Sequence, residues 1–247
     1  MQRHFKWLLG VLLSVSSAQA LAGPADYVYS PKVEKGEGEL ELIHGSSDLP
    51  AGGRATATSV SVGYGVTESW FSSVYLKRSE AAGKRSDFIE LENKFQLTEH
   101  GDRPIHVGLI TELELPLQSG DPVEVKFGPL LQSDFGKLQL NGNLVFERVF
   151  GQADEHATAG GTQLGYQWQA KYRWLSSFGF GVQGMGDLGQ WDNLDTTSAQ
   201  NHRAGMMMFG KVKLSEETAV KYNVAALFGV TDAAPNQTYR FQLEYEF

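Results

Sequence analysis

The sequence predicts an all-β fold, namely a transmembrane, antiparallel, up-and-down β-barrel of about twelve strands. Three observations predict it. Segments in which apolar and polar residues alternate recur along almost the whole chain of 247 residues. A short apolar leader stands at the N-terminus, and the last ten residues alternate strictly and end on an aromatic residue. Because the side chains of a β-strand point to opposite faces in turn, such segments offer one face to lipid and the other to a polar interior.

The C-terminal segment 238–247 carries this alternation most clearly. One face is aromatic and aliphatic, formed by Tyr239, Phe241, Leu243, Tyr245 and Phe247. The other face is polar, formed by Arg240, Gln242, Glu244 and Glu246. The pattern resembles the closing strand of the outer-membrane β-barrels of Gram-negative bacteria, in which a terminal Phe is the recognition signal for the barrel-assembly machinery. The resemblance implies that the five apolar residues are an assembly signal, and that the partners are this machinery and outer-membrane lipid.

The N-terminus has the three parts of a secretory signal peptide. Arg3 and Lys6 precede the apolar run 7–15, and small residues at positions 20 and 22 form a cleavage site near Ala22, with 18–20 as a second candidate. The run is too short for a membrane-spanning helix, which needs roughly 20 residues. Residues 1–22 are therefore predicted to direct export through the Sec-type secretion translocon and to be removed.

The composition excludes several classes of protein. The chain has no cysteine, so it has neither a disulfide framework nor a thiolate metal site. Removal of residues 1–22 moves the net charge from −8 to −10, which argues against a nucleic-acid partner. The mean hydropathy of −0.27 is typical of a barrel, because only every second residue of a strand meets lipid. No motif in the chain indicates a cofactor.

Twelve alternating segments are each long enough to cross a bilayer at a tilt, which takes roughly 9–11 residues. They are 36–46, 54–65, 69–79, 85–97, 104–115, 122–133, 136–149, 162–175, 178–188, 203–214, 218–230 and 237–247. Residues 36–247 are thus predicted to form the barrel, and residues 23–35 an irregular periplasmic lead-in. Ten or fourteen strands are the alternatives, since 36–46, 69–79 and 122–133 alternate least clearly.

The connecting segments alternate in length. Short turns lie at 66–69, 133–136, 175–177 and 215–218, and most of the intervening links are longer, as at 47–53, 116–122, 150–161, 189–202 and 231–236. Outer-membrane barrels have short periplasmic turns and longer outer loops. With the short turns on the periplasmic side, both termini are periplasmic, which requires an even number of strands. A soluble β-sandwich is the alternative, but it does not explain the aromatic residues that gather near the strand ends.

The polar faces carry an uneven distribution of charge. The early segments contribute an acidic wall of Glu90, Glu92, Glu112 and Glu114, and the late segments contribute a basic wall of Lys171, Arg173, Lys211, Lys213, Lys221 and Arg240. If the strands close in sequence order, the two walls face each other across the lumen. Two interpretations remain open: ion pairs across the lumen that fill a small barrel, or a water-filled pore with a transverse field.

Catalytic and metal sites have weaker support. His44 and Ser46 share a face near one rim, but no nucleophile elbow accompanies them. His156 with Asp154 and Glu155, and His202 with Asp192 and Asp195, lie in the two longest loops and are more consistent with solvated acidic loops than with a metal site. Alternation turns the outer two residues of Met206–Met208 to lipid. No catalytic, cofactor or metal residue is therefore predicted.

These observations favour a narrow, porin-like channel for small hydrophilic solutes in the outer membrane of a Gram-negative bacterium. The alternative is a non-conducting structural or interaction barrel that acts through the long loops 150–161 and 189–202. An enzyme such as an outer-membrane phospholipase or protease is the least supported possibility.

Overall fold

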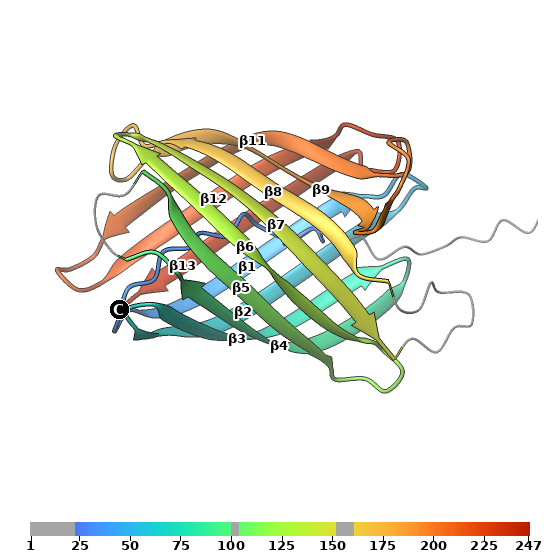
Figure 1. Ribbon diagram of the computed structural model, residues 1–247, viewed down its shortest axis with the longest axis horizontal. Helices are drawn as coiled ribbons and strands as arrows, with labels where there is room; N and C mark the ends of the chain where they lie inside the picture. The colour runs from blue at the N-terminus through green and yellow to red at the C-terminus, as the bar shows by residue number, and fades with distance from the viewer. Residues whose placement is uncertain (1–22, 100–103, 152–160) are drawn as a thin grey trace, which may run out of the picture.

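The computed structural model describes residues 23–99, 104–151 and 161–247, and this part of the chain forms one antiparallel sheet (Figure 1). Its twelve long strands are β1 (Gly38–Asp48), β2 (Arg54–Thr67), β3 (Trp70–Ala81), β4 (Lys84–Gln96), β5 (His106–Pro116), β6 (Val123–Phe135), β7 (Leu138–Phe150), β8 (Gln163–Tyr172), β9 (Gly179–Gln190), β11 (Asn201–Lys213), β12 (Ala219–Gly229) and β13 (Gln237–Glu246). The two-residue strand β10 (Asn193–Leu194) pairs only with the end of β9. In the described part of the chain, no helix is long and apolar enough to cross a membrane.

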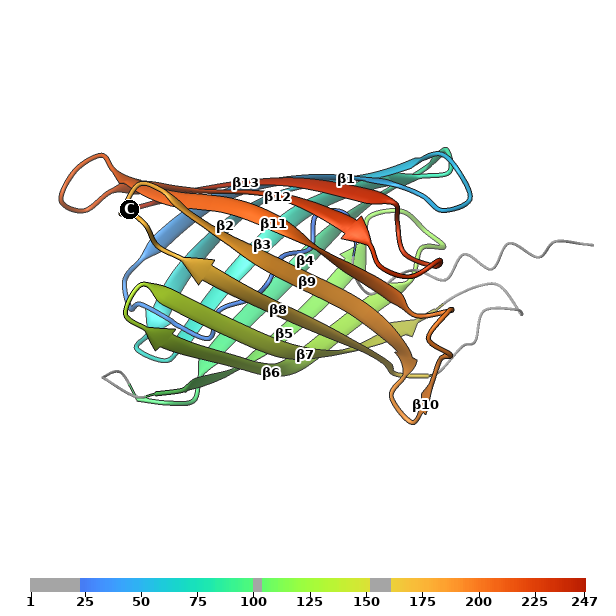
Figure 2. The ribbon, with the colours of Figure 1, turned by 90° about the horizontal axis from the view of Figure 1, so that it is seen from above.

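The sheet closes on itself. Strand β1 pairs with β2 on one side and with β13 on the other, and β8 pairs with β9. Every strand of the ring therefore has two antiparallel neighbours, and β10 extends a hairpin at the rim, as Figure 2 shows. Closure removes the exposed sheet edges whose backbone groups would be costly in a bilayer. The prediction of a twelve-stranded, up-and-down antiparallel barrel is confirmed.

The two faces of each strand differ as the alternation predicts. In β4, Ile89 and Leu91 point outward and are exposed, whereas Glu90 and Glu92, which alternate with them, are buried inside the barrel. Along β13 and at the residue that follows it, the five apolar residues of the expected assembly signal are all exposed on the outside, while Arg240 is buried inside. An apolar outer belt around a polar interior is the arrangement of a membrane β-barrel.

The two ends of the barrel differ in their connections. The start of β1 and the end of β13 lie at one end, here called the terminal end, together with the short links 67–70, 135–138 and 213–219. Most links at the opposite, loop end are longer. The exception is the tight hairpin between β3 and β4, where Ala82 (φ 50°) and Gly83 (φ 78°) both have positive φ. Two such residues form the type I′ turn that matches the twist of a two-residue hairpin.

Residues 24–34, here called the lumen segment, run through the barrel from its loop-end half toward the terminal end (Figures 1 and 2). The sequence places residues 23–35 in a periplasmic lead-in, but Val28, Tyr29 and Val33 are buried inside the barrel, with exposed fractions of 2–7%. The interior has room for this chain because glycines face it at close approaches. A Cβ atom at Gly45 would meet the carbonyl oxygen of Pro24, and one at Gly65 would meet that of Glu34.

Two expectations fall on parts of the chain that are outside the described residues. These are the signal peptide 1–22 and the acidic loop group Asp154, Glu155 and His156. Both stay predictions.

The closed hydrogen-bond ladder leads to a first prediction. We expect the unheated protein in SDS to migrate at a different apparent mass from the boiled protein, because no strand edge is available where unzipping could begin. SDS-PAGE of paired samples measures this difference. Identical migration of the two samples would contradict a closed barrel.

Candidate functional site

Four buried carboxylates face the lumen from two neighbouring strands of the barrel. Glu90 and Glu92 on β4 and Glu112 and Glu114 on β5 all face the lumen, with exposed fractions of 2–8%. The register places Glu90 beside Glu114 and Glu92 beside Glu112. Like charges directly opposite each other destabilise a pair of strands. This acidic wall therefore requires counter-ions close by.

Lysines on the adjoining strands supply these counter-ions. The Nζ atom of Lys77 on β3 lies 2.7 Å from Glu90 and 2.6 Å from Glu114. Lys126 on β6 lies 3.9 Å from Glu112 and 3.6 Å from Glu147 of β7. Charge is therefore balanced between neighbouring strands. Neither lysine was predicted as a member of a charged wall, although the alternation in their segments places both on the polar face.

The basic wall is balanced locally as well. Lys221 on β12 contacts Glu244 at 2.7 Å and also contacts Glu246, and Lys211 on β11 contacts Glu246. In the ring order, β4 and β5 stand half a circumference from β11 and β12, but these ion pairs stay on their own side. The ion pairs of these residues thus do not join the acidic wall to the basic wall across the lumen.

The remaining members of the basic wall have different surroundings. Arg240 is buried and donates hydrogen bonds to the carbonyl oxygen of Asp26 at 2.5 Å and to Gln183 at 3.2 Å. The Lys171 ammonium lies 5.1 Å from the centre of the Phe209 ring. Arg173 and Lys213 are exposed at the terminal end. The six residues therefore do not form a single continuous surface.

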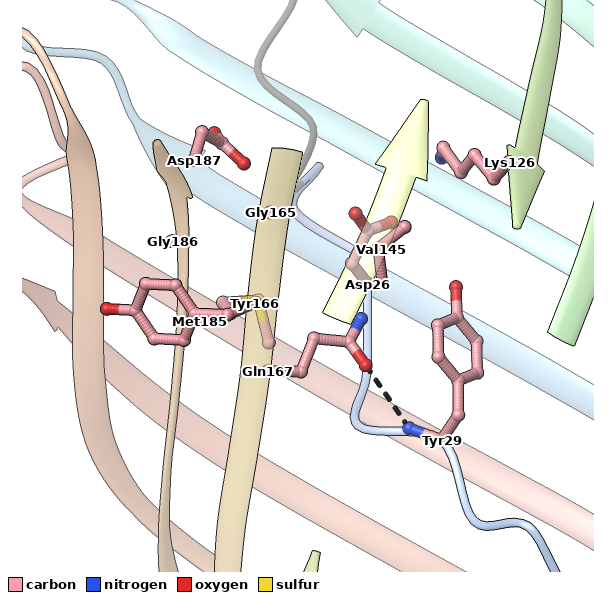
Figure 3. A pocket seen from close by; sticks show the side chains of 10 residues that line it. All are labelled: Asp26, Tyr29, Lys126, Val145, Gly165, Tyr166, Gln167, Met185, Gly186 and Asp187. Atoms are coloured by element: carbon pink, nitrogen blue, oxygen red, sulfur yellow. Dashed lines mark hydrogen bonds between the residues drawn. The ribbon is translucent and has the colours of Figure 1, made fainter. Parts of the chain in front are cut away.

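Tyr29 of the lumen segment is buried against the wall of the barrel. Its ring packs against an apolar patch inside the lumen, formed by Ile110 of β5, Leu130 of β6 and Val145 of β7. Its backbone N–H donates to Gln167 at 3.4 Å, as Figure 3 shows, and its carbonyl oxygen accepts from Asn143 at 3.1 Å. A sequence signal for this patch exists, because Ile110 occupies a polar-face position in its alternating segment.

Further contacts fix the segment on either side of Tyr29. The Tyr27 hydroxyl lies 3.2 Å from the Tyr75 hydroxyl and 3.4 Å from Glu92. Burial, with the nearby Glu92 charge, raises the pKa of Tyr27 well above its usual value, so the hydroxyl keeps its proton. Toward the terminal end, Ser30 donates to Gln132 at 2.8 Å and the Val33 N–H donates to Gln96 at 2.9 Å.

Two small cavities lie beside the lumen segment. One of about 10 Å³ lies between Tyr29, Gln167 and Asp187 (Figure 3). A second, of about 30 Å³, lies between Tyr27, Glu92 and Lys126. Volumes of this size hold at most one or two water molecules. Neither cavity can therefore hold a solute while the lumen segment is in place.

His44 and Ser46, which were weighed for catalysis, and His202, which was weighed for a metal site, point out of the lumen. His44 and Ser46 lie on the outer face of β1, and the His44 ring contacts the Thr58 hydroxyl through Nδ1 at 2.8 Å. His202 lies at the loop end, where its Nδ1 contacts the Tyr166 hydroxyl and its Nε2 contacts Gln200, each at 2.8 Å. The first contact joins paired residues of β1 and β2, and the other two join β11 to β8 and to the loop before β11, so these side chains link nearby elements.

One cluster of carboxylates among the described residues could hold a metal ion, but a lysine already lies beside it. Carboxylate oxygens of Glu37, Glu39 and Glu246 lie within 4.8 Å of one another at the terminal end. Lys221 lies 3.9 Å from Glu37 and contacts Glu246, so an ammonium group already balances this cluster. Met206 and Met208 point outward, whereas Met207 is buried inside, as the alternation predicts.

The last strand ends in a contact that closes the barrel. The Phe247 N–H donates to the Gly38 carbonyl at 2.9 Å, and the Gly38 N–H donates to the Phe247 carbonyl at 2.8 Å. A Cβ atom at position 38 would meet the Phe247 ring, so a larger residue there would displace the ring. Outside, Phe247 stacks on Tyr245 with ring centres 5.8 Å apart.

The fold is similar to those of solved outer-membrane channels. A channel from Pseudomonas putida F1 aligns with a TM-score of 0.63, covering 91% of this chain and 98% of that one at 11% identity. The KdgM porin aligns with a TM-score of 0.56 (85% and 99% covered, 10% identity), and the NanC porin with 0.55 (84% and 98% covered, 15% identity). A further KdgM structure, with a TM-score of 0.54, contains disordered oligogalacturonate.

The sequence itself matches no family model and no curated protein. At these identities the structural alignments describe shape and topology. The chain therefore has the closed antiparallel barrel fold of the outer-membrane porins.

Proposed function

We propose that this protein is a narrow outer-membrane channel for small hydrophilic solutes in a Gram-negative bacterium. The observation that carries the proposal is the interior of the barrel, which is lined by carboxylates, lysines and amides from several strands. Placing so many polar groups inside a membrane protein is costly unless they are paired or hydrated. A barrel of this strand number lies between those filled by side chains, at roughly eight strands, and the open porins at about 16–18.

The proposal includes an orientation and a route of assembly. The short turns of the terminal end would lie in the periplasm and the long loops outside the cell. The chain would be exported by the secretion translocon, lose residues 1–22 near Ala22, and be inserted by the barrel-assembly machinery that reads the last strand. Labelling of introduced cysteines in intact cells tests the orientation, since those at the loop end are expected to react with an impermeant reagent.

The charge of the interior indicates which solutes are favoured. The side of the lumen formed by β3–β7 carries the carboxylates Glu90, Glu92, Glu112, Glu114 and Glu147 against the ammonium groups Lys77, Lys94 and Lys126. An excess of fixed negative charge in a low-dielectric channel attracts cations and repels anions. We therefore expect a preference for cations.

Recording single channels in planar bilayers is the direct test. Small conductance steps with a cation-selective reversal potential are the expected result. Complete absence of conductance over a wide range of voltage would overturn the channel proposal.

One observation favours a second function. The lumen segment runs inside the barrel, and two cavities beside it measure about 10 and 30 Å³. A barrel that stays filled would be a non-conducting scaffold that acts through its loops, 150–161 and 189–202. The same recordings distinguish the two functions, because a scaffold produces no steps. We propose no enzymatic activity, and a phospholipid-hydrolysis assay of the purified barrel is expected to show none.

The two charged walls give a prediction about ion selectivity. Glu112→Gln removes a negative charge from the acidic wall and is expected to weaken the cation preference. Lys221→Gln leaves Glu244 and Glu246 without their shared counter-ion and is expected to strengthen it. Reversal potentials in a salt gradient measure both changes. Lys84→Gln is the control, because Lys84 is exposed beyond the lumen. Shifts of the same sign in the first two variants would contradict the assignment of the walls.

A further inference from the structure

We propose that the lumen segment, residues 24–34, is the gate of this channel, and that solutes pass when the segment swings out of the barrel. The proposal rests on the proposed channel function and on removal of residues 1–22. It adds the moving part and the pathway that its movement would open. Four features of the described residues support it.

The first feature is the apolar patch of Ile110, Leu130 and Val145, here called the seat, which contacts this segment. Ile110 and Leu130 are completely buried, yet both side chains point into the lumen. In a hydrated passage, apolar residues that face inward would expose apolar surface to water, which is unfavourable. Here, with Val145, they receive the Tyr29 ring. The patch therefore exists for a state in which Tyr29 is docked.

The second feature is the kind of bond that holds the segment. The hydrogen bonds described between residues 24–34 and the barrel wall all involve side chains. Examples are the Tyr29 carbonyl with Asn143 and the Val33 N–H with Gln96. Strands of the wall are instead joined by continuous backbone ladders. The segment can therefore leave without breaking any strand pairing, and water can satisfy the freed amides.

The third feature is a pivot at the terminal end. Gly36 has a φ of 82°, and its N–H donates to the Gly65 carbonyl at 2.8 Å. The Gly65 N–H donates in turn to the Glu37 carbonyl at 2.9 Å. These bonds anchor residues 36–37 to β2, while glycine supplies the backbone freedom needed next to them. After cleavage, the segment would be tethered only here, so it could rotate as an arm.

The fourth feature is the surface that the segment covers. Its departure would uncover Glu92, whose carboxylate lies 3.4 Å from the Tyr27 hydroxyl, and Gln132, which binds Ser30. It would also release the Asn143 and Gln167 amides. It would also uncover the guanidinium group of Arg240, which donates to the Asp26 carbonyl oxygen. The uncovered pathway thus offers amides and charges of both signs, which suits small polar solutes.

The absence of cysteine from the chain allows a clean test by cross-linking. A Cβ atom at Gly108 would lie 2.7 Å from Cβ of Pro31. A disulfide spans roughly 3.5–4.5 Å between Cβ atoms, so Gly108→Cys with Pro31→Cys can form one after a shift of about 1 Å of the lumen segment. The matched control is Ser47→Cys with Thr238→Cys. These hydroxyls lie 2.8 Å apart on paired strands, so their disulfide leaves the lumen segment free.

We expect the oxidised gate pair to lose its conductance steps and to regain them after reduction, while the control pair conducts in both states. Tyr29→Ala should empty the apolar seat and raise the fraction of time open several-fold. Heat-modifiable migration verifies that each variant is folded, and mass spectrometry verifies each disulfide. Normal conductance in a fully oxidised gate pair would overturn the gate and leave the channel function intact. Silence of the wild-type protein and of a variant lacking residues 24–34 would instead overturn the channel function.

Discussion

Replacing Lys77 by methionine is expected to lower the free energy of unfolding of the barrel by about 3–5 kcal/mol. Lys77 is the shared counter-ion of Glu90 and Glu114, at 2.7 and 2.6 Å, and these two carboxylates face each other in register on β4 and β5. Both are largely shielded from solvent. Without the ammonium group, two like charges remain side by side in a poorly hydrated wall. Loss of the folded, heat-modifiable band with increasing urea measures the effect.

Two companion variants separate this effect from a general loss of lysine. Lys84→Met removes an exposed partner of Asp121 at the loop end and should cost at most about 1 kcal/mol. Adding Glu90→Gln to the Lys77→Met variant should restore part of the lost stability, because a neutral amide removes the repulsion with Glu114. Equal stability of the Lys77→Met and Lys84→Met variants would show that the wall is well hydrated.

Deleting Phe247 is expected to remove most of the assembled barrel from the membrane while synthesis continues. The residue has two structural tasks. Its backbone exchanges two hydrogen bonds with Gly38 where β13 meets β1, and its ring covers that glycine. The resemblance of the last strand to the outer-membrane assembly signal adds a recognition task. Immunoblots of whole cells and of membrane fractions measure synthesis and assembly separately.

The matched control is Phe241→Ala. Phe241 also points outward from β13 and is 39% exposed, but it lies in the middle of the strand. This variant loses an aromatic ring and keeps the closing contact, so it should assemble nearly as well as the wild type. If Phe241→Ala assembled as poorly as the deletion variant, assembly would depend on the aromatic residues of the outer face in general. The terminal residue would then have no specific role in assembly.

Much of the barrel could be predicted from the sequence because lipid imposes a period of two on every strand. The segment predicted at 136–149 is observed as β7, Leu138–Phe150, and that predicted at 237–247 as β13, Gln237–Glu246. The small strand β10 was missed, since two residues are too few to show alternation. The short hairpin between β3 and β4 also departs from the predicted pattern of short links at one end and long links at the other. Residue type alone does not predict the positive φ of Ala82 in this turn.

The contents of the lumen could be predicted less well. Alternation fixes which residues face inward, but it does not say which partner each one meets. Glu112 was expected to face the late strands, whereas Lys126 lies beside it on β6. The lumen segment escaped prediction because it is irregular and forms no ladder, so it has no periodicity. In the sequence, the apolar patch that contacts Tyr29 could be recognised only from isolated apolar residues at polar-face positions, such as Ile110.

The contact between Asp26 and Arg240 has a consequence for the maturation of the protein. These residues are 214 positions apart, so the first part of the exported chain meets its partner only after the last strand is in place. Contacts of such long range form late in folding. Under the proposed export route, the peptide bonds near Tyr27 and Tyr29 would until then be open to periplasmic proteases, whereas in the finished barrel the docked position of the lumen segment encloses them. Protection of these bonds from proteolysis would therefore report the moment at which assembly of each molecule is complete.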